Sequence, residues 1–146
     1  MLYSEDINIL LVEDDEIDIK NVQRAFKKNK IVNPLHIARN GLEAFAKLRG
    51  TEGHEKITPR PSIILLDINM PKMNGIEFLT ELRADAELSN IAVFVMTTSG
   101  QDHDISRAYA LNVAGYIIKP VSFESFVKSV STLNTYWNLI ELPVAG

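Results

Sequence analysis

The sequence contains no cysteine, which excludes disulfide bonds and thiolate metal sites and favours a cytoplasmic location. It has no apolar run close to the roughly 20 residues that a membrane-spanning helix needs, and its first residues lack the basic segment that opens a secretory signal. An excess of positive charge is missing too, because the formal net charge is -4. We therefore expect neither a membrane nor a nucleic acid as the partner, since binding to phosphate backbones requires a basic face.

The chain does contain a regular alternation of apolar and amphipathic segments. Its 146 residues, 46% of them hydrophobic and 23% charged, suit one domain, which we expect to span residues 1–146. Apolar segments predict five strands, at Ile7–Val12, Leu35–Ala38, Ile63–Leu66, Ile91–Met96 and Tyr116–Ile118. Apolar residues three or four positions apart predict five helices, one after the acidic residues 13–16 and others at Asn40–Arg49, Ile76–Ala84, Asp102–Leu111 and Phe123–Leu139. In the first helix we expect Ile17, Val22, Ala25 and Phe26 to share the buried side. Residues 51–61 are expected to form a long loop.

This alternation predicts a parallel sheet with helices on both faces, because parallel strands need crossover connections and these are right-handed. We therefore expect a three-layer, doubly wound α/β fold. Four branched apolar residues in a row at 63–66 are typical of a strand buried on both faces. Polar residues directly follow the predicted strands: Glu13, Asp14 and Asp15 after the first, Asp67 after the third, Thr97 after the fourth and Lys119 after the fifth.

These polar residues gather at the edge of the sheet where open α/β proteins bind ligands. Carboxylates that meet there repel one another unless a cation lies among them. Without cysteine or a nearby histidine, that cation is expected to be Mg²⁺ or Mn²⁺ rather than zinc. Lys119 adds an ammonium group and Thr97 a hydroxyl group, which together suit a phosphoryl group. The residue types therefore predict phosphoryl transfer to Asp67 as the nucleophile.

Two longer segments carry a family resemblance. Asp67 lies in Leu-Leu-Asp-Ile-Asn-Met-Pro-Lys-Met-Asn-Gly, and Lys119 lies in Gly-Tyr-Ile-Ile-Lys-Pro. With the acidic pair after the first strand and the threonine that ends the fourth, these segments resemble the receiver domains of two-component response regulators in order and spacing. The resemblance covers almost the whole chain, with a core at about residues 5–132. It implies a flavodoxin-like fold with strand order 2-1-3-4-5, and a phosphoacceptor that assists its own phosphorylation and dephosphorylation rather than an enzyme.

The same resemblance implies a role for each residue of the site. Asp67 would accept the phosphoryl group from the phosphohistidine of a sensor histidine kinase, and Lys119 would bind a phosphoryl oxygen. Asp14 would bind Mg²⁺ directly, Glu13 through water, and Asn69 through its backbone carbonyl, alongside Asp67. Many members of the family have aspartate at the Glu13 position, so direct coordination by the longer side chain is left open.

A conformational switch is also implied by the resemblance. Thr97 and Thr98 both offer a hydroxyl group, and the family's spacing to Lys119 selects Thr97. Its hydroxyl would turn toward the phosphoryl group, and Tyr116 would follow from an exposed to a buried rotamer, unless Tyr116 is a plain surface aromatic residue. Asp15 is expected to be an acid in the first turn of its helix.

Residues 133–146 form a C-terminal extension that is more apolar than a chain end requires, with Tyr136, Trp137, Leu139 and Ile140. The extension and the loop at residues 53–61 resemble single-domain regulators that are encoded beside bacterial phytochrome kinases. This narrower resemblance implies a phytochrome as the kinase and a homodimer in which the extension reaches the partner, Trp and Tyr being typical interface residues. The alternative is an extension that folds back on its own helix. With no further module after the last helix, we expect output through contacts with an unidentified downstream protein.

Three other functions compete with this hypothesis. A phosphatase with an aspartate nucleophile usually has a second aspartate two residues later, and Asn69 occupies that position. A flavin mononucleotide site is disfavoured because residues 13–16 are all acidic and would repel a phosphate. A receiver domain that acts as a scaffold without phosphate is disfavoured by the intact Asp67, Thr97 and Lys119.

Overall fold

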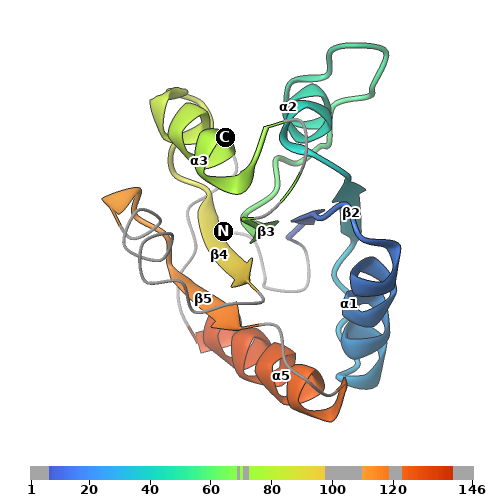
Figure 1. The fold of residues 1–146 in the computed structure, drawn as a ribbon. Coiled ribbons are helices and arrows are strands. Elements are labelled where there is room, and N and C mark those ends of the chain that lie inside the picture. Colours follow the sequence, from blue (N-terminus) through green and yellow to red (C-terminus); the bar gives the residue numbers. More distant parts are fainter. Residues whose placement is uncertain (1–6, 69, 71–72, 98–109, 119–122, 140–146) are drawn as a thin grey trace.

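The computed structural model describes residues 7–68, 70, 73–97, 110–118 and 123–139, and in them five parallel strands form one sheet (Figure 1). The strands are β1 (Ile9–Val12), β2 (Leu35–Ala38), β3 (Ile63–Asp67), β4 (Ala92–Thr97) and β5 (Gly115–Ile118). Their order is β2-β1-β3-β4-β5, which confirms the predicted doubly wound sheet. β3 lies at the centre and is buried along its whole length, as its unbroken apolar sequence predicts.

Within the described ranges, four helices connect or follow these strands: α1 (Glu16–Lys28), α2 (Gly41–Arg49), α3 (Gly75–Ala84) and α5 (Phe123–Leu139). Each of the first three begins at a side chain that accepts hydrogen bonds from backbone N–H groups of the first turn. These caps are Asp15 for α1, Asn40 for α2 and Asn74 for α3, the last in a reciprocal capping box with Glu77. Asp15 therefore lies one residue before the first turn and caps it, whereas the sequence predicted an acid within that turn.

Helices cover both faces of the sheet, so the chain has two apolar cores (Figure 1). On one face, α2 and α3 pack against alternate strand residues such as Leu10 and Ile64, and their Phe45 and Phe78 rings lie 4.7 Å apart. On the other face, α1 and α5 pack against the intervening residues, Ile63 among them. Every apolar side chain of β1 and β3 lies in one core or the other, and the polar side chains come only at the end of β3, with Asp67, and just beyond β1, with Glu13.

The buried side of α1 differs from the predicted one. Ile19, Val22, Ala25 and Phe26 form its buried side, and Ile17 is 71% exposed. Ile17 and Phe26 are nine residues apart, which at 3.6 residues per turn places them on about opposite sides of the helix. The loop predicted at 51–61 contains no strand or helix, as expected. The helix predicted at Asp102–Leu111 falls almost entirely outside the described residues.

Candidate functional site

The register of the sheet brings two acidic segments together. Val12 of β1 pairs with Leu66 of β3, and the next residues along the two strands are Glu13 and Asp67. On the other side of β1, the Glu13 N–H donates a hydrogen bond of 2.9 Å to the carbonyl of Ala38, so the chain is still held to the sheet at that residue. The carboxylates therefore leave the sheet side by side, at the carboxyl ends of adjacent strands.

Glu13, Asp14 and Asp67 form a compact cluster in which one carboxylate oxygen of each lies within 4.8 Å of the others. Glu13 is fully buried, Asp67 is 5% exposed, and Asp14 is exposed to solvent. One Glu13 carboxylate oxygen accepts a hydrogen bond of 3.2 Å from the Asp14 backbone N–H. The cluster therefore has two buried carboxylates and one that faces water, which leaves one open side.

A tight connection between β3 and α3 holds Asp67 in position. The Gly75 N–H donates a 2.9 Å hydrogen bond to the carbonyl of Ile68, and a Cβ atom at Gly75 would lie 2.6 Å from the Ile68 Cα and 2.8 Å from the Asp67 carbonyl oxygen. Only a residue without a side chain allows this approach. The Asn74–Gly75 pair thus fixes the first turn of α3 against the backbone of Asp67.

The remaining predicted site residues lie at the same edge of the sheet or outside the described residues. Thr97 ends β4 and pairs with Ile118, the last residue of β5, and Tyr116 pairs with Val95. For Thr97 and Tyr116 the structure describes only the backbone. Asn69 and Lys119 lie outside the described residues, although Lys119 follows Ile118 in sequence. The structure thus brings Glu13, Asp14 and Asp67 together and leaves the other assignments as predictions.

Two contacts near the cluster could not be predicted from local sequence patterns, because the residues that form them are far apart along the chain. Met73, in the connection from β3 to α3, has a positive φ of 75°, and its side chain lies over Gly41 at the start of α2, where a Cβ would be 2.8 Å from its sulfur atom. Arg39, which follows β2, forms an ion pair with Glu16 at the start of α1. The first contact connects the segment after Asp67 to α2, and the second places a cation beside the acidic start of α1.

The donor set of the cluster suits a hard divalent cation. Three carboxylates within this distance repel one another, and a cation among them relieves the repulsion. Oxygen donors alone, without sulfur or imidazole, match the preference of Mg²⁺, Ca²⁺ and Mn²⁺. A site built from few carboxylates leaves coordination positions for water or for phosphate oxygens.

Comparison with known families agrees with this arrangement. Residues 9–131 match the family model of the response regulator receiver domain. This chain belongs to that family.

Individual receiver proteins are similar over nearly the whole length. The response regulator Rcp1 of Synechocystis is 38% identical over 94% of this chain and 93% of its own. The phosphorylated cyanobacterial phytochrome response regulator RcpA has a crystal structure with a TM-score of 0.87 at 34% identity, covering 95% of this chain and 99% of RcpA. The crystal structure of the Mn²⁺-bound form of Rcp1 gives a TM-score of 0.82 at 35% identity, covering 94% of this chain and 99% of that one.

The receiver domain's C-terminal extension is described only in part. Helix α5 runs to Leu139, as predicted, and buries Phe126, Val130 and Leu133 against the core it shares with α1. The side chains of Tyr136, Trp137 and Leu139 and all of Ile140 lie outside the described residues, so the predicted interface is not tested. No helix within the described ranges has the length and apolar character needed to cross a lipid bilayer.

Proposed function

We propose that this receiver domain accepts a phosphoryl group on Asp67 from the phosphohistidine of a sensor histidine kinase, with Mg²⁺ bound beside it. The observation that carries the proposal is the cluster of Glu13, Asp14 and Asp67 at the ends of β1 and β3 in a chain of this family. The relatives support it, because RcpA was crystallised phosphorylated and Rcp1 with Mn²⁺.

In the proposed reaction an oxygen of the Asp67 carboxylate attacks phosphorus. The new O–P bond forms as the N–P bond of phosphohistidine breaks, and the imidazole nitrogen keeps the electron pair and takes up a proton. Asp67 is nearly buried and held by the close backbone approach of Gly75, so little motion is needed to orient it. A bound divalent ion supplies charge neutralisation for the carboxylates and for the phosphoryl oxygens.

The proposed metal ligands are Asp14, Glu13, Asp67 and the backbone carbonyl of Asn69. Asp14 is the exposed member of the cluster, which suits a ligand at the open side. Glu13 is fully buried, and one of its oxygens already accepts the Asp14 N–H, so we propose that it acts through water or holds the Asp14 backbone in place.

Lys119 and Thr97 complete the proposed phosphoryl site. Lys119 would neutralise a phosphoryl oxygen, and Thr97 would donate its hydroxyl group to another. Tyr116 would respond to Thr97 as the second part of the switch. The pairing of Thr97 with Ile118 supports this assignment, because Lys119 follows Ile118 directly along the chain.

We further propose a single receiver domain of residues 1–146, with its core at about 5–132, that signals through protein contacts in the cytoplasm. The kinase would be a phytochrome, which is supported by the similarity to phytochrome response regulators. The extension at 133–146, with Tyr136, Trp137, Leu139 and Ile140, would form a homodimer interface. Size-exclusion chromatography of Trp137→Ala tests the dimer: a mass unchanged from the wild type contradicts it.

Intact mass after incubation with acetyl phosphate and Mg²⁺ tests the phosphoacceptor. We expect one phosphoryl adduct on the wild type, no adduct on Asp67→Asn or without Mg²⁺, and an unchanged adduct on the control Asp18→Asn, which neutralises a carboxylate outside the cluster. An adduct that persists in Asp67→Asn contradicts the assignment. A wild type that takes no phosphate from acetyl phosphate or from its kinase favours the scaffold function instead.

A further inference from the structure

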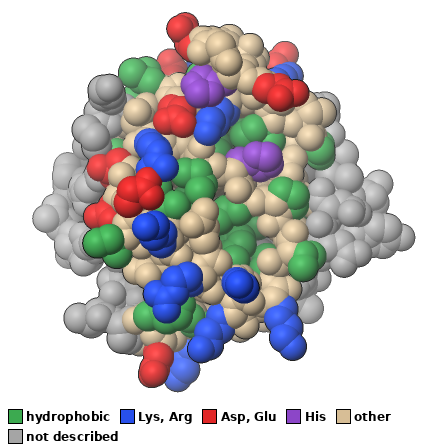
Figure 2. Space-filling view, turned by 90° about the vertical axis from the view of Figure 1, so that its right-hand side faces the viewer, with side chains coloured by type: hydrophobic (Ala, Val, Ile, Leu, Met, Phe, Trp, Pro, Cys, Tyr) green, Lys and Arg blue, Asp and Glu red, His purple; other side chains and the backbone are tan. Residues whose placement is uncertain are grey.

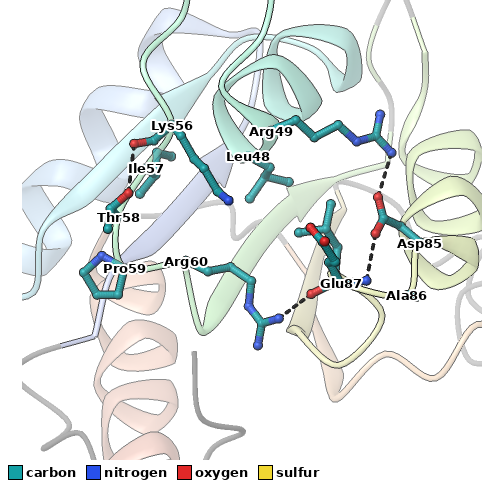
Figure 3. A pocket seen from close by; sticks show the side chains of 11 residues that line it. Leu48, Arg49, Lys56, Ile57, Thr58, Pro59, Arg60, Asp85, Ala86 and Glu87 are labelled. Atoms are coloured by element: carbon teal, nitrogen blue, oxygen red, sulfur yellow. Dashed lines mark hydrogen bonds and ion pairs between the residues drawn. The ribbon is translucent and has the colours of Figure 1, made fainter. Parts of the chain in front are cut away.

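A second candidate site lies at the amino ends of strands β3 and β4, whereas the acidic cluster lies at the carboxyl ends of β1 and β3. It is a cavity of about 710 Å³ between the end of α2, residues 56–60 before β3, and the turn at residues 85–88 after α3 (Figure 3). These segments precede β3 and β4, whereas the carboxylate cluster follows β1 and β3. The cavity is therefore separate from the proposed phosphoacceptor site, and its volume is that of a small-molecule site.

The lining combines an apolar floor with cationic side chains. Leu48, Ile57 and Leu88 are buried and belong to the core between the sheet and α2 and α3. Arg49, Lys56 and Arg60 supply three positive charges, and Asp85 and Glu87 supply two negative ones. An apolar floor with cations beside it suits an organic anion, since one part of such a ligand is apolar and the other is charged.

Two of the three cations are held in place by contacts within the cavity wall. The Arg49 guanidinium forms an ion pair of 3.0 Å with Asp85 and lies 4.3 Å above the Phe45 ring centre. Its hydrogen bond to Asp85 holds the pKa of that carboxyl below its ordinary value. The Arg60 guanidinium donates to the backbone carbonyl of Glu87 across the cavity (Figure 3). Fixed donors lose little conformational entropy when a ligand binds.

The third cation, Lys56, is held through its backbone and extends its side chain into the cavity (Figure 3). The neighbouring Ile57 N–H donates a 3.0 Å hydrogen bond to the carbonyl of Lys47, and a Cβ at Gly50 would lie 2.8 Å from the Lys56 Cβ. Among the residues that the structure describes, no carboxylate forms an ion pair with the Lys56 ammonium group. The lining as a whole therefore carries one more cation than carboxylates, three against two.

We propose that this cavity binds a small organic anion whose carboxylate or phosphate lies between Lys56 and Arg60 and whose apolar part lies against the exposed carbon atoms of the wall, those of Pro59 and Ala86 among them. This site is independent of phosphorylation at Asp67. The ligand chemistry follows from the lining, which has three cations, two carboxylates and exposed carbon atoms. Charge-assisted hydrogen bonds from two cations give orientation, and the exposed carbon atoms of the wall add affinity when the ligand removes them from water.

The test is a set of amide NMR titrations of the full chain with probes that separate the two parts of the ligand. Benzoate and phenyl phosphate carry both an anion and a ring, acetate carries the anion alone, and benzyl alcohol carries the ring alone. We expect saturable shifts confined to residues 47–60 and 85–88, with the better ring-bearing anion binding about tenfold more tightly than acetate or benzyl alcohol. Whichever of benzoate and phenyl phosphate binds more tightly identifies the natural ligand as a carboxylate or a phosphate.

Three variants complete the test. Lys56→Gln should weaken binding of that anion about tenfold, and Glu87→Gln should strengthen it by removing the competing carboxylate. The matched control Lys28→Gln removes an exposed cation on α1 and should leave binding unchanged. Shifts spread over the lysines of α1, equal binding of benzyl alcohol, or no effect of Lys56→Gln would each overturn the proposal.

Discussion

Substituting Gly75 by alanine tests whether the start of α3 fixes the backbone at Asp67. The new Cβ would lie 2.6 Å from the Ile68 Cα and 2.8 Å from the Asp67 carbonyl oxygen, far inside the 3.5–4.0 Å at which carbon atoms pack well. Both neighbours are backbone atoms, so the strand end or the helix must move. Overpacking of this kind costs about 1–3 kcal/mol, and the better helix propensity of alanine recovers less than about 1 kcal/mol at this first helical position.

Thermal and urea unfolding measured by circular dichroism would give this cost directly. For a domain of this size a loss of about 1–3 kcal/mol lowers Tm by about 2–10 °C, and displacement of Asp67 should slow phosphorylation by acetyl phosphate. Gly41→Ala is the matched control, because its Cβ would meet the flexible side chain of Met73, which can rotate away. If Gly75→Ala unfolds within about 0.5 kcal/mol of Gly41→Ala, the spread of neutral surface substitutions, the steric argument is refuted.

Three further predictions concern the frame around the site. Arg83 donates hydrogen bonds to four backbone carbonyl groups in the turns before β4 and β5. Arg83→Met should therefore lower the free energy of unfolding by about 2–4 kcal/mol and make amide hydrogen exchange faster in β5 than in β1. Equal exchange in the two strands would contradict this. Arg49 lowers the pKa of Asp85 in the folded state. The Arg49–Asp85 pair therefore stabilises the fold at pH values above the ordinary carboxyl pKa of about 4, and this stabilisation is lost as the pH falls through the lower pKa of the folded state. Asp85→Asn should therefore flatten the acid limb of a Tm against pH curve, and an unchanged limb would exclude the pair as a contributor. Lys47 donates to the Ile37 carbonyl on the open edge of β2, so Lys47→Gln should increase self-association above that of the wild type in sedimentation velocity. A distribution of species unchanged from the wild type would contradict this edge protection.

Much of the fold was predictable because strand and helix signals here are strong and local. The unbroken apolar run of β3, the start of α2 at Asn40 and the start of α5 at Phe123 all lie where the sequence places them. The convergence of Asp67 with the acidic pair followed from a general property of parallel sheets, that carboxyl ends share one edge. The strand order came from the family resemblance, since alternation alone does not fix it.

What the sequence did not predict depends on contacts between distant segments. Arg83 lies in a helix whose spacing shows only that it is polar, and its acceptors lie in two turns that no local pattern joins to it. The same is true of Met73 and Gly41. Ile17 is a different case, because the helical period of 3.6 residues already places it opposite Phe26, and its apolar side chain is exposed all the same.

The acidic residues also help to specify the register of the sheet. Alternate residues of β1 and β3 enter two cores that are both apolar, so sliding β1 by one residue would exchange apolar side chains between the cores at modest cost. The polar residues at the two ends of β1 prevent this. A slip in one direction would draw the buried Glu13 into the apolar sheet, and a slip in the other would break the 2.7 Å hydrogen bond from the Asn8 side chain to the Pro59 carbonyl. Either leaves a buried polar group without its partners, which costs more than the apolar exchange. Glu13 therefore aligns β1 with β3, and that alignment places it next to Asp67.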